Sequence, residues 1–192
     1  MSKTLGIAMI TQNEQIHMPS TLAQFYHIAD DLVVIDSFST DETAEWARRM
    51  GARVIQREFK FDFGDQKNFA ISQLKTDWVY LHDPDERLEP TLLEIIKPVI
   101  DGDIILQEVG ILSNLDLDCV GIPRKNFVDG VQTNIYPDYQ FRLFKNHCRY
   151  EGRVHEEIKG WREKSRTELD YVRIEEEKQP GRFNILHYKS SL

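Results

Sequence analysis

The chain has 192 residues, of which 41% are hydrophobic and 29% are charged, and its formal net charge is −8. This length suits one domain with a substantial core, and the acidic balance argues against a general nucleic-acid binder, which normally carries a basic face. Because no apolar run approaches a membrane span, the N-terminus lacks a signal-peptide layout, and the two cysteines match no zinc or redox spacing, we expect a cytoplasmic protein with free thiols.

The first half of the chain alternates between the two kinds of regular structure. Short apolar runs rich in β-branched residues predict four strands, at residues 5–10, 31–36, 52–56 and 78–82. Apolar residues at helical spacing predict helices at residues 19–29 and 65–74. Ser39 and Glu42 form a capping box that predicts a further helix, and Gly51 lies just past its end. This alternation predicts an α/β fold with a mostly parallel sheet and helices on both faces.

The second half of the chain is less regular. Apolar spacing predicts a helix at residues 90–100, and strands are expected at residues 120–128, 139–145 and 183–188. Residues 160–182 are highly charged, which favours a solvated helix or a loop. No internal repeat or low-complexity linker divides the chain, so we expect a single domain over residues 1–192.

The fourth predicted strand ends in a cluster of carboxylates, His82-Asp83-Pro84-Asp85-Glu86. Buried carboxylates are costly unless a cation or a hydrogen-bond donor compensates them. Asp83 and Asp85 are two residues apart, so in an extended segment they point to the same side. Two hard oxygen ligands at the carboxyl end of a strand suit Mg²⁺ or Mn²⁺ carrying substrate phosphates. The alternative is an acidic turn without a ligand, since Pro and Asp are common turn formers.

Polar residues also follow the first two predicted strands, namely Thr11, Asn13 and Glu14 after the first and residues 36–41 after the second. Each cluster alone is explained by loop chemistry or helix capping, but the carboxyl ends of parallel strands form the binding crevice of an α/β sheet. The chain has neither Gly-x-Gly-x-x-Gly nor Gly-x-x-x-x-Gly-Lys-Ser/Thr. A nucleotide held at this edge would therefore need a metal and side chains to neutralise its phosphates.

Six segments resemble, in order, glycosyltransferase family 2 with the GT-A fold. They are Thr11-Gln12-Asn13-Glu14, residues 34–41 (Val-Ile-Asp-Ser-Phe-Ser-Thr-Asp), Gln66-Lys67-Asn68-Phe69-Ala70, Asp83-Pro84-Asp85-Glu86, residues 136–144 (Tyr-Pro-Asp-Tyr-Gln-Phe-Arg-Leu-Phe) and Arg153-Val154-His155-Glu156. The last two are similar to the branch that includes bacterial lipopolysaccharide-core glucosyltransferases. The resemblance implies a GT-A-type, Rossmann-like sheet with a metal-binding Asp-x-Asp at the end of its fourth strand. It assigns residues 1–89 to a nucleotide-binding half and residues 90–192 to an acceptor-side half.

The resemblance implies a nucleotide-sugar donor, and a UDP-hexose is expected. Asp36 would accept a hydrogen bond from the uracil base, because a carboxylate pairs well with an imide N–H. Lys67 would lie near the base or the diphosphate, and solvation of a helix is an equally good role for it. Neighbouring residues would line the nucleoside pocket, namely Thr11, Asn13, Glu14 and Ser37.

The same resemblance implies a metal cofactor, Mn²⁺ or Mg²⁺. Asp83 is similar to the residue that approaches the ribose or the metal, and Asp85 to the direct metal ligand. The metal would bridge both phosphates and stabilise the leaving nucleoside diphosphate as a Lewis acid. His155 would complete the coordination or bind the diphosphate, with a structural role as the alternative, and His187 is a further candidate.

The family inverts the anomeric centre by a single displacement, which needs a general base for the acceptor hydroxyl. Asp138 matches the position of that base, with a Pro-Asp turn as the alternative role, and Glu86 is a weaker competitor. Arg142 would orient Asp138 or contact the diphosphate, because guanidinium pairs bidentately with carboxylate and phosphate.

The sequence is also compatible with two other classes of protein. A sugar nucleotidyltransferase would suit the sheet and the acidic pair, but such enzymes usually have a Gly-rich loop after the first strand, which this chain lacks. A non-catalytic relative would bind nucleotide-sugar or glycan without turnover. For partners we expect a glycan or lipid-linked acceptor and no nucleic acid. Peripheral contact with the inner face of the membrane and a homo-oligomer are both left open.

Overall fold

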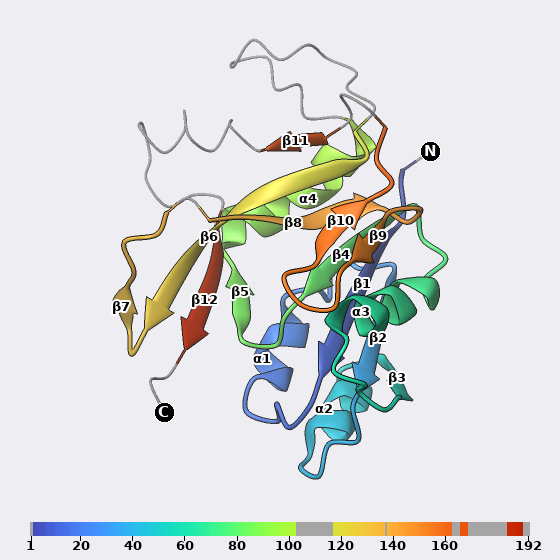
Figure 1. Cartoon of the computed structure of the whole chain (residues 1–192), viewed down its shortest axis with the longest axis vertical. Coiled ribbons are helices and arrows are strands. Elements are labelled where there is room, and N and C mark those ends of the chain that lie inside the picture. Colours follow the sequence, from blue (N-terminus) through green and yellow to red (C-terminus); the bar gives the residue numbers. More distant parts are fainter. Residues whose placement is uncertain (1, 103–116, 137, 163–165, 169–183, 190–192) are drawn as a thin grey trace. The chain divides into compact units, whose positions relative to one another are not determined.

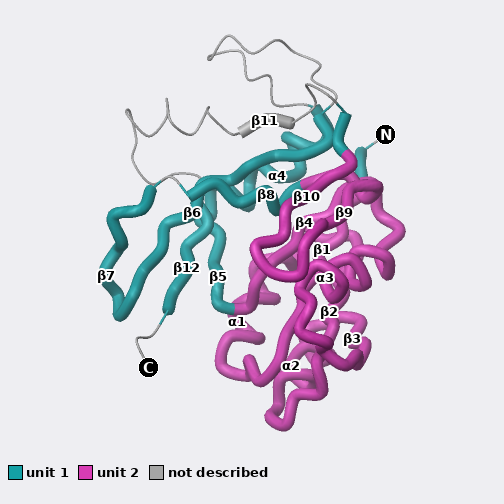
Figure 2. The backbone as a smooth tube through the Cα atoms, in the orientation of Figure 1, with its two compact units in different colours: residues 1–3, 85–143, 161–192 teal, residues 4–84, 144–160 magenta. Residues whose placement is uncertain are grey.

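The computed structural model describes residues 2–102, 117–136, 138–162, 166–168 and 184–189. The chain divides into two compact units, drawn in different colours in Figure 2. We call residues 4–84 and 144–160 the N-terminal unit, and residues 1–3, 85–143 and 161–192 the C-terminal unit. The division falls between Pro84 and Asp85, inside the acidic motif, whereas the functional halves expected from the sequence meet at residues 89 and 90.

In its described residues, the N-terminal unit is built on four parallel strands (Figure 1). They are β1 (Leu5–Thr11), β2 (Asp31–Asp36), β3 (Arg53–Gln56) and β4 (Trp78–His82), in the order β3-β2-β1-β4. Most of β1, β2 and β4 is buried, in keeping with their continuous apolar runs. Thr11 lies opposite Asp36 in the register, so the loops that follow β1 and β2 leave the sheet at the same edge. The predicted parallel sheet is confirmed.

Helices cover both faces of this sheet. They are α1 (Met18–Ala23), α2 (Thr43–Arg49) and α3 (Phe63–Ser72). Met9 and Val34 share a buried cluster with side chains of α1 and α2. Gly6 points to the opposite face, where a Cβ would lie 2.8 Å from the Leu74 side chain, just past the end of α3. The sequence-based expectation of helices on both faces is therefore confirmed.

The predicted boundaries of α1 and α2 are wrong. The helix expected over residues 19–29 ends at Ala23, and α2 begins at Thr43 without a capping box. Glu42 occupies the N-cap position, and its side chain makes no capping bond. The Ser39 hydroxyl donates instead to the carboxylate of Asp36. A hydrogen bond to the residue three positions earlier has therefore replaced the capping bond that the sequence pattern suggested.

A short hairpin from later in the chain packs against α3. It consists of β9 (Arg149–Glu151) and β10 (Glu157–Lys159), which are antiparallel. The Asn68 side chain on α3 forms two hydrogen bonds with the backbone of Tyr150, as a neighbouring strand would. It donates to the Tyr150 carbonyl and accepts from the Tyr150 N–H, both at 2.8 Å. The helix begins two residues before its predicted start, where the Asp62 side chain caps it.

The C-terminal unit combines one described helix with a mixed sheet. The elements are β5 (Glu86–Leu88), α4 (Pro90–Asp101), β6 (Cys119–Val128), β7 (Val131–Gln132), β8 (Asp138–Lys145, of which 138–143 belong to this unit), β11 (Arg166–Glu168) and β12 (Ile185–Lys189). The strand order is β8-β6-β12-β5, with β12 parallel to β6 and antiparallel to β5, and both β7 and β11 pair with β6.

The helix and the strands predicted for the second half are found in the described residues, but β11 is a strand within residues 160–182, where a solvated helix or a loop was expected. The helix expected at residues 90–100 is α4, which buries Leu92, Ile96 and Ile100, and the strands expected at residues 120–128 and 139–145 are β6 and β8. The last strand begins at Ile185, while Phe183 and most of residues 160–182 lie outside the described residues.

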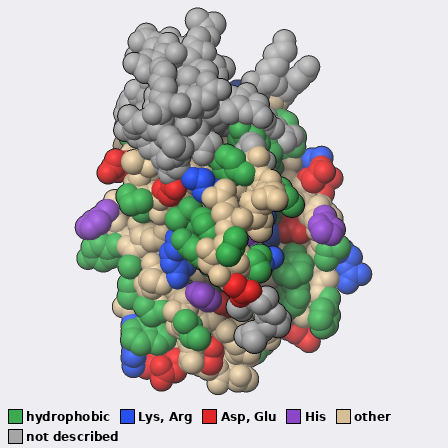
Figure 3. Space-filling view, turned by 90° about the vertical axis from the view of Figure 1, so that its left-hand side faces the viewer, with side chains coloured by type: hydrophobic (Ala, Val, Ile, Leu, Met, Phe, Trp, Pro, Cys, Tyr) green, Lys and Arg blue, Asp and Glu red, His purple; other side chains and the backbone are tan. Residues whose placement is uncertain are grey.

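Cys119 and Cys148 are buried free thiols, as expected. Among the described helices, none has the length and apolar composition needed to cross a bilayer. On the described part of the face shown in Figure 3, Lys and Arg side chains are scattered among Asp and Glu and form no continuous basic area.

Candidate active site

The loops that follow β1 and β2 are tied to each other by hydrogen bonds. The Asn13 backbone N–H donates to the Ser39 hydroxyl, and the Asn13 side-chain oxygen accepts from the Thr40 N–H, both at 2.8 Å. The Glu14 backbone N–H donates to the Thr43 hydroxyl at 2.7 Å. Asn13 has a φ of +56°, a left-handed conformation that Asn tolerates better than most residues. Asn13 and Glu14 therefore have a structural role at this edge of the sheet, in addition to the nucleoside contact expected from the sequence.

Asp36 ends β2 and is fully buried. Its carboxylate accepts hydrogen bonds from the backbone N–H and the hydroxyl of Ser39, and from the Gln56 side chain at 3.3 Å. These donors compensate a charge that would otherwise be costly to bury. The adjacent Ser37 is also buried, and its hydroxyl accepts from Gln66 at 3.2 Å. Asp36 is therefore a rigid acceptor at the carboxyl end of the sheet.

The hydroxyl of Thr11, opposite Asp36 in the register, has a different environment. It is buried, and it has no hydrogen-bond partner among the residues that the structure describes. A buried polar group without a partner destabilises a protein by about 1–3 kcal/mol. A ligand that bonds to this hydroxyl would remove that penalty.

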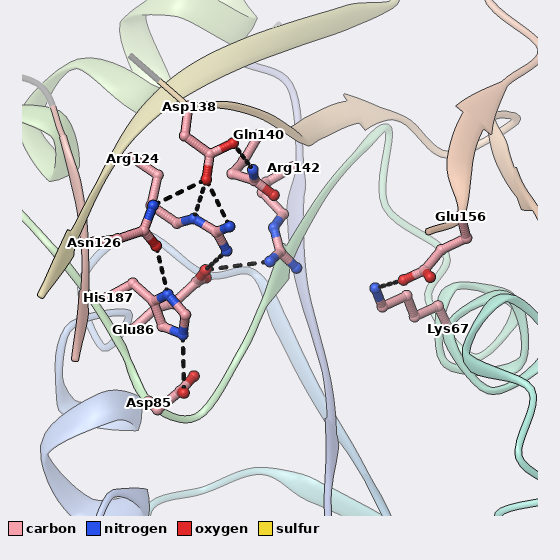
Figure 4. Close-up of polar contacts among 10 residues, drawn as sticks. All are labelled: Lys67, Asp85, Glu86, Arg124, Asn126, Asp138, Gln140, Arg142, Glu156 and His187. Atoms are coloured by element: carbon pink, nitrogen blue, oxygen red, sulfur yellow. Dashed lines mark hydrogen bonds and ion pairs between the residues drawn. The ribbon is translucent and has the colours of Figure 1, made fainter. Parts of the chain in front are cut away.

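Lys67, on α3, forms an ion pair with Glu156, which lies between the two strands of the hairpin (Figure 4). The two side chains are only 11% and 10% exposed, and the Lys67 Nζ lies 5.1 Å from the centre of the Tyr150 ring. Lys67 is therefore much less exposed to water than a residue on a solvated helix face, and solvation of the helix was its alternative role. The sequence alone does not predict this ion pair between Lys67 and Glu156.

A separate network of charged and amide side chains joins β5, β6, β8 and β12 in the C-terminal unit (Figure 4). At its centre, Oδ2 of Asp138 accepts from Nε and Nη2 of Arg124 at 3.0 and 2.7 Å. The same oxygen accepts from Asn126 at 3.1 Å, and Oδ1 accepts from Gln140 at 2.8 Å. Burial alone would raise the pKa of Asp138, but the bonds from Asn126 and Arg124 and the charge of Arg124 outweigh it and lower the pKa. Asp138 is therefore ionised at neutral pH.

Glu86 lies beside this group and is fully buried. Its Oε1 accepts from Arg124 and from Arg142, each at 3.2 Å. Arg142 was expected to orient Asp138 or to contact the diphosphate. The structure shows Arg142 paired with Glu86, and Arg124 paired with both carboxylates.

His187 on β12 connects this network to the acidic motif. Its Nδ1 lies 2.7 Å from the side-chain oxygen of Asn126, and its Nε2 lies 3.1 Å from Oδ2 of Asp85. The His187 side chain is 8% exposed and that of Asp85 is 31% exposed. The chain thus places a nearly buried imidazole nitrogen against a partly exposed carboxylate.

The remaining predicted metal ligands lie in the N-terminal unit. Asp83 directly follows β4 and is half-buried, and His155 is an exposed residue with a φ of +53°, between β9 and β10. No group of three or more His, Cys, Asp or Glu side chains that could hold a metal is found in the described parts of the chain. The metal roles of Asp83 and His155 stay predictions.

Sequence reasoning missed several members of the C-terminal network. A usable signal was present, because the missed residues recur two apart on strands whose other residues are mostly apolar, which places them on one face. These residues are Arg124 and Asn126 on β6 and Gln140, two residues after Asp138, on β8.

Comparison with solved structures shows the fold. The crystal structure of S. aureus TarS 1-349 in complex with UDP matches 97% of this chain and 60% of that chain, with a TM-score of 0.60 and 14% sequence identity. A second TarS 1-349 structure, in complex with UDP-GlcNAc, matches 69% of this chain and 37% of that chain, with a TM-score of 0.53 and 20% identity. The predicted GT-A fold is thereby confirmed.

Related sequences share only part of their length with this chain. An uncharacterized glycosyltransferase of Rickettsia typhi is 34% identical over 95 residues, which is 50% of this chain and 32% of the relative. The prophage-derived glycosyltransferase SunS of Bacillus subtilis is 23% identical over 158 residues, covering 80% of this chain and 34% of SunS. The chain thus matches about a third of each of these relatives. Glycosyl transferase family 2 itself matches residues 7–109, more than half of the chain, and the protein belongs to this family.

Proposed function

We propose that the protein is a metal-dependent, inverting glycosyltransferase that moves a hexose from a UDP-sugar to a hydroxyl group of a glycan or lipid-linked acceptor. The observation that carries the proposal is the pair formed by Asp85 and His187, whose Oδ2 and Nε2 atoms lie 3.1 Å apart. Family membership supports sugar transfer and lends no support to the nucleotidyltransferase alternative.

The Asp85–His187 pair fits a divalent cation. Carboxylate oxygen and imidazole nitrogen are both ligands of such ions, and adjacent ligands of an octahedral ion with bonds of about 2.1 Å lie about 3 Å apart. Mg²⁺ usually takes one or two protein ligands and completes its sphere with substrate phosphates and water, so a two-residue site suits a metal that arrives with a diphosphate. When bound, it would act as a Lewis acid toward the leaving diphosphate. Asp83 and His155 are the further ligands expected from the sequence.

The N-terminal unit supplies groups suited to a uridine nucleotide. Asp36 is a fixed carboxylate that can accept from the imide N–H of uracil, and the Thr11 hydroxyl lacks a partner within the described residues. Ser37 and Lys67 complete the expected contacts, with the Lys67 ammonium near the base or diphosphate. The TarS structures contain UDP and UDP-GlcNAc, which supports UDP as the carrier here.

Asp138 is the proposed general base. In a direct displacement the acceptor oxygen attacks the anomeric carbon, the bond from that carbon to the diphosphate oxygen breaks, and the hydroxyl proton passes to the base. The lowered pKa of Asp138 keeps it as a carboxylate, which can accept the proton as the hydroxyl becomes acidic during attack. Arg124 would hold the carboxylate in place through its two hydrogen bonds.

The first experiment is to measure UDP release from a panel of UDP-sugars with Mn²⁺, Mg²⁺ or chelator, without added acceptor. We expect slow release from one sugar that needs metal and is abolished by Asp85→Asn. Glu94→Gln is the matched control, because it removes an exposed carboxylate from the same unit. Release that persists in chelator would contradict the metal role. Metal-dependent UDP binding without turnover on any sugar, with acceptor glycans present, would favour the non-catalytic relative.

A further inference from the structure

Asn126 links the carboxylate proposed as the base to the histidine proposed as a metal ligand. Its amide nitrogen lies 3.1 Å from Oδ2 of Asp138, and its amide oxygen lies 2.7 Å from Nδ1 of His187 (Figure 4). Its strand, β6, lies between β8 and β12 in the sheet, so the side chain reaches both neighbours. Asn126 lies outside the six segments that resemble the family.

The direction of these hydrogen bonds is set at the Asp138 end. Asp138 is ionised beside Arg124 and can only accept, so the amide nitrogen of Asn126 must face it. The amide oxygen then faces His187, and since this oxygen can only accept, Nδ1 must carry a proton. In a neutral imidazole with the proton on Nδ1, the lone pair is on Nε2, the atom that faces Asp85.

We propose that Asn126 is a positioning residue that holds His187 in the Nδ1–H tautomer and so keeps Nε2 free to share a divalent cation with Asp85. The inference rests on the proposed function, because it concerns the metal site assigned there. The competing tautomer has its proton on Nε2 and donates it to Asp85, which would occupy both metal ligands with one hydrogen bond. Asn126 opposes that tautomer, because only a proton on Nδ1 satisfies its oxygen.

The direct test is nitrogen-15 NMR of the His187 ring in the full chain without metal, at a pH above the ordinary imidazole pKa of about 6.5. We expect a protonated Nδ1 and an unprotonated Nε2 in the wild type, and a shift toward the Nε2–H tautomer in Asn126→Ala. Asn126→Asp retains an acceptor for Nδ1, and its carboxyl group must carry a proton on the oxygen that faces the ionised Asp138, so it should retain the wild-type tautomer. Gln140→Ala is the matched control, because it removes another hydrogen bond to Asp138 at 2.8 Å and should leave the His187 signals in place.

An unprotonated Nδ1 or a protonated Nε2 in the wild type would overturn the inference without any variant. So would an unchanged tautomer in a folded Asn126→Ala protein. If Asn126→Ala does not fold, the NMR signals of His187 in the wild type and in Asn126→Asp still test the inference. Loss of the Nδ1 proton in Asn126→Asp would show that the acceptor oxygen at position 126 does not hold that proton on Nδ1.

Metal affinity provides a second readout. Mn²⁺ titrated into protein saturated with UDP should bind about 10- to 100-fold more weakly to Asn126→Ala than to wild type, as expected for loss of a group that orients a ligating His. Asn126→Asp should lose less. Unchanged Mn²⁺ affinity in Asn126→Ala, with a changed tautomer, would overturn the link to the metal. Failure of wild-type protein to bind UDP and Mn²⁺ at all would count against the proposed function, while the NMR result would still decide the tautomer.

Discussion

At the scale of single residues, the buried carboxylates of the candidate site differ in their partners. Asp36 is compensated by a backbone N–H, a hydroxyl and an amide, whereas Glu86 is compensated by the guanidinium groups of Arg124 and Arg142. Removing one partner of a buried ion pair leaves the other charge uncompensated, which destabilises far more than losing an exposed pair. Glu86 is therefore the carboxylate on which the stability of the C-terminal network depends most.

We expect Glu86→Ala to lower the free energy of unfolding by about 3–5 kcal/mol, because the buried Arg142 and the half-buried Arg124 lose their shared partner. The matched control is Glu45→Ala, which breaks an exposed pair with Arg49 on α2 and should change stability by about 0.5 kcal/mol or less. Urea unfolding followed by circular dichroism measures both. Equal effects in the two variants would show that the Glu86 carboxylate is not needed to hold the arginines.

The lowered pKa of Asp138 predicts a pH dependence of stability. Because its folded-state pKa lies below the ordinary value of 3.8, its contribution is fully present above that value and is lost as the pH falls through the folded pKa. We expect the difference in unfolding free energy between wild type and Asp138→Asn to be constant near neutral pH and to narrow below about pH 4. Urea titrations across this range would measure it, and a difference that widens on acidification would contradict the lowered pKa.

At the scale of elements, the contact between α3 and the hairpin of β9 and β10 keeps Lys67 dry. The helix approaches so closely that a Cβ on Gly64 would lie 2.2 Å from the carbonyl oxygen of Gly152. Asn68 holds the same face by two hydrogen bonds to the Tyr150 backbone. The close approach of Gly152 therefore explains why residue 64 is a glycine, although glycine has a low helix propensity.

We expect Gly64→Ala to destabilise the protein by about 1–3 kcal/mol, although alanine favours a helix by about 0.5–1 kcal/mol over glycine, because the overlap with Gly152 outweighs propensity. Ser72→Ala, at the exposed end of the same helix, should change stability by about 0.5 kcal/mol or less. Thermal unfolding compares the two. A stabilised Gly64→Ala protein would mean that the hairpin does not press on the helix.

At the scale of the whole molecule, the residues assigned to the nucleotide, the metal and the base are divided between the two compact units. Thr11, Asp36 and Lys67 lie in the N-terminal unit, and Asp138 and His187 lie in the C-terminal unit. Each unit also has one buried thiol, Cys148 in the first and Cys119 in the second. These thiols can report on the opening of each unit separately.

If the units open independently, Glu86→Ala should speed thiol labelling of Cys119 more than that of Cys148, and Gly64→Ala should do the reverse. The physical reason is that the ion pairs of Glu86 with Arg124 and Arg142 lie in the C-terminal unit, and the close approach of Gly64 to Gly152 lies in the N-terminal unit. Labelling rates read peptide by peptide by mass spectrometry would measure this. Equal acceleration of both thiols in both variants would show that the chain opens as one cooperative unit.

Local patterns were sufficient for much of the N-terminal unit. The apolar runs of β1, β2 and β4 predict buried parallel strands, and the polar residues that follow β1 and β2 do lie together at one edge of the sheet. Helix boundaries were less predictable, since Ser39 bonds to Asp36 across the loop instead of capping α2. The Ser39 hydroxyl can make either of these local hydrogen bonds, so the sequence pattern does not choose between them.

By itself, the sequence determined the α/β class, the order of the helices and strands in the first half of the chain and the carboxylates at strand ends, because hydrophobic periodicity and strand-end chemistry are local properties. Only the tertiary structure decided which groups meet. It paired Lys67 with Glu156, and it placed His187 between Asn126 and Asp85, residues 61 and 102 positions away. The partner of a side chain in a sheet depends on strand order and register, and these follow from packing of the whole chain.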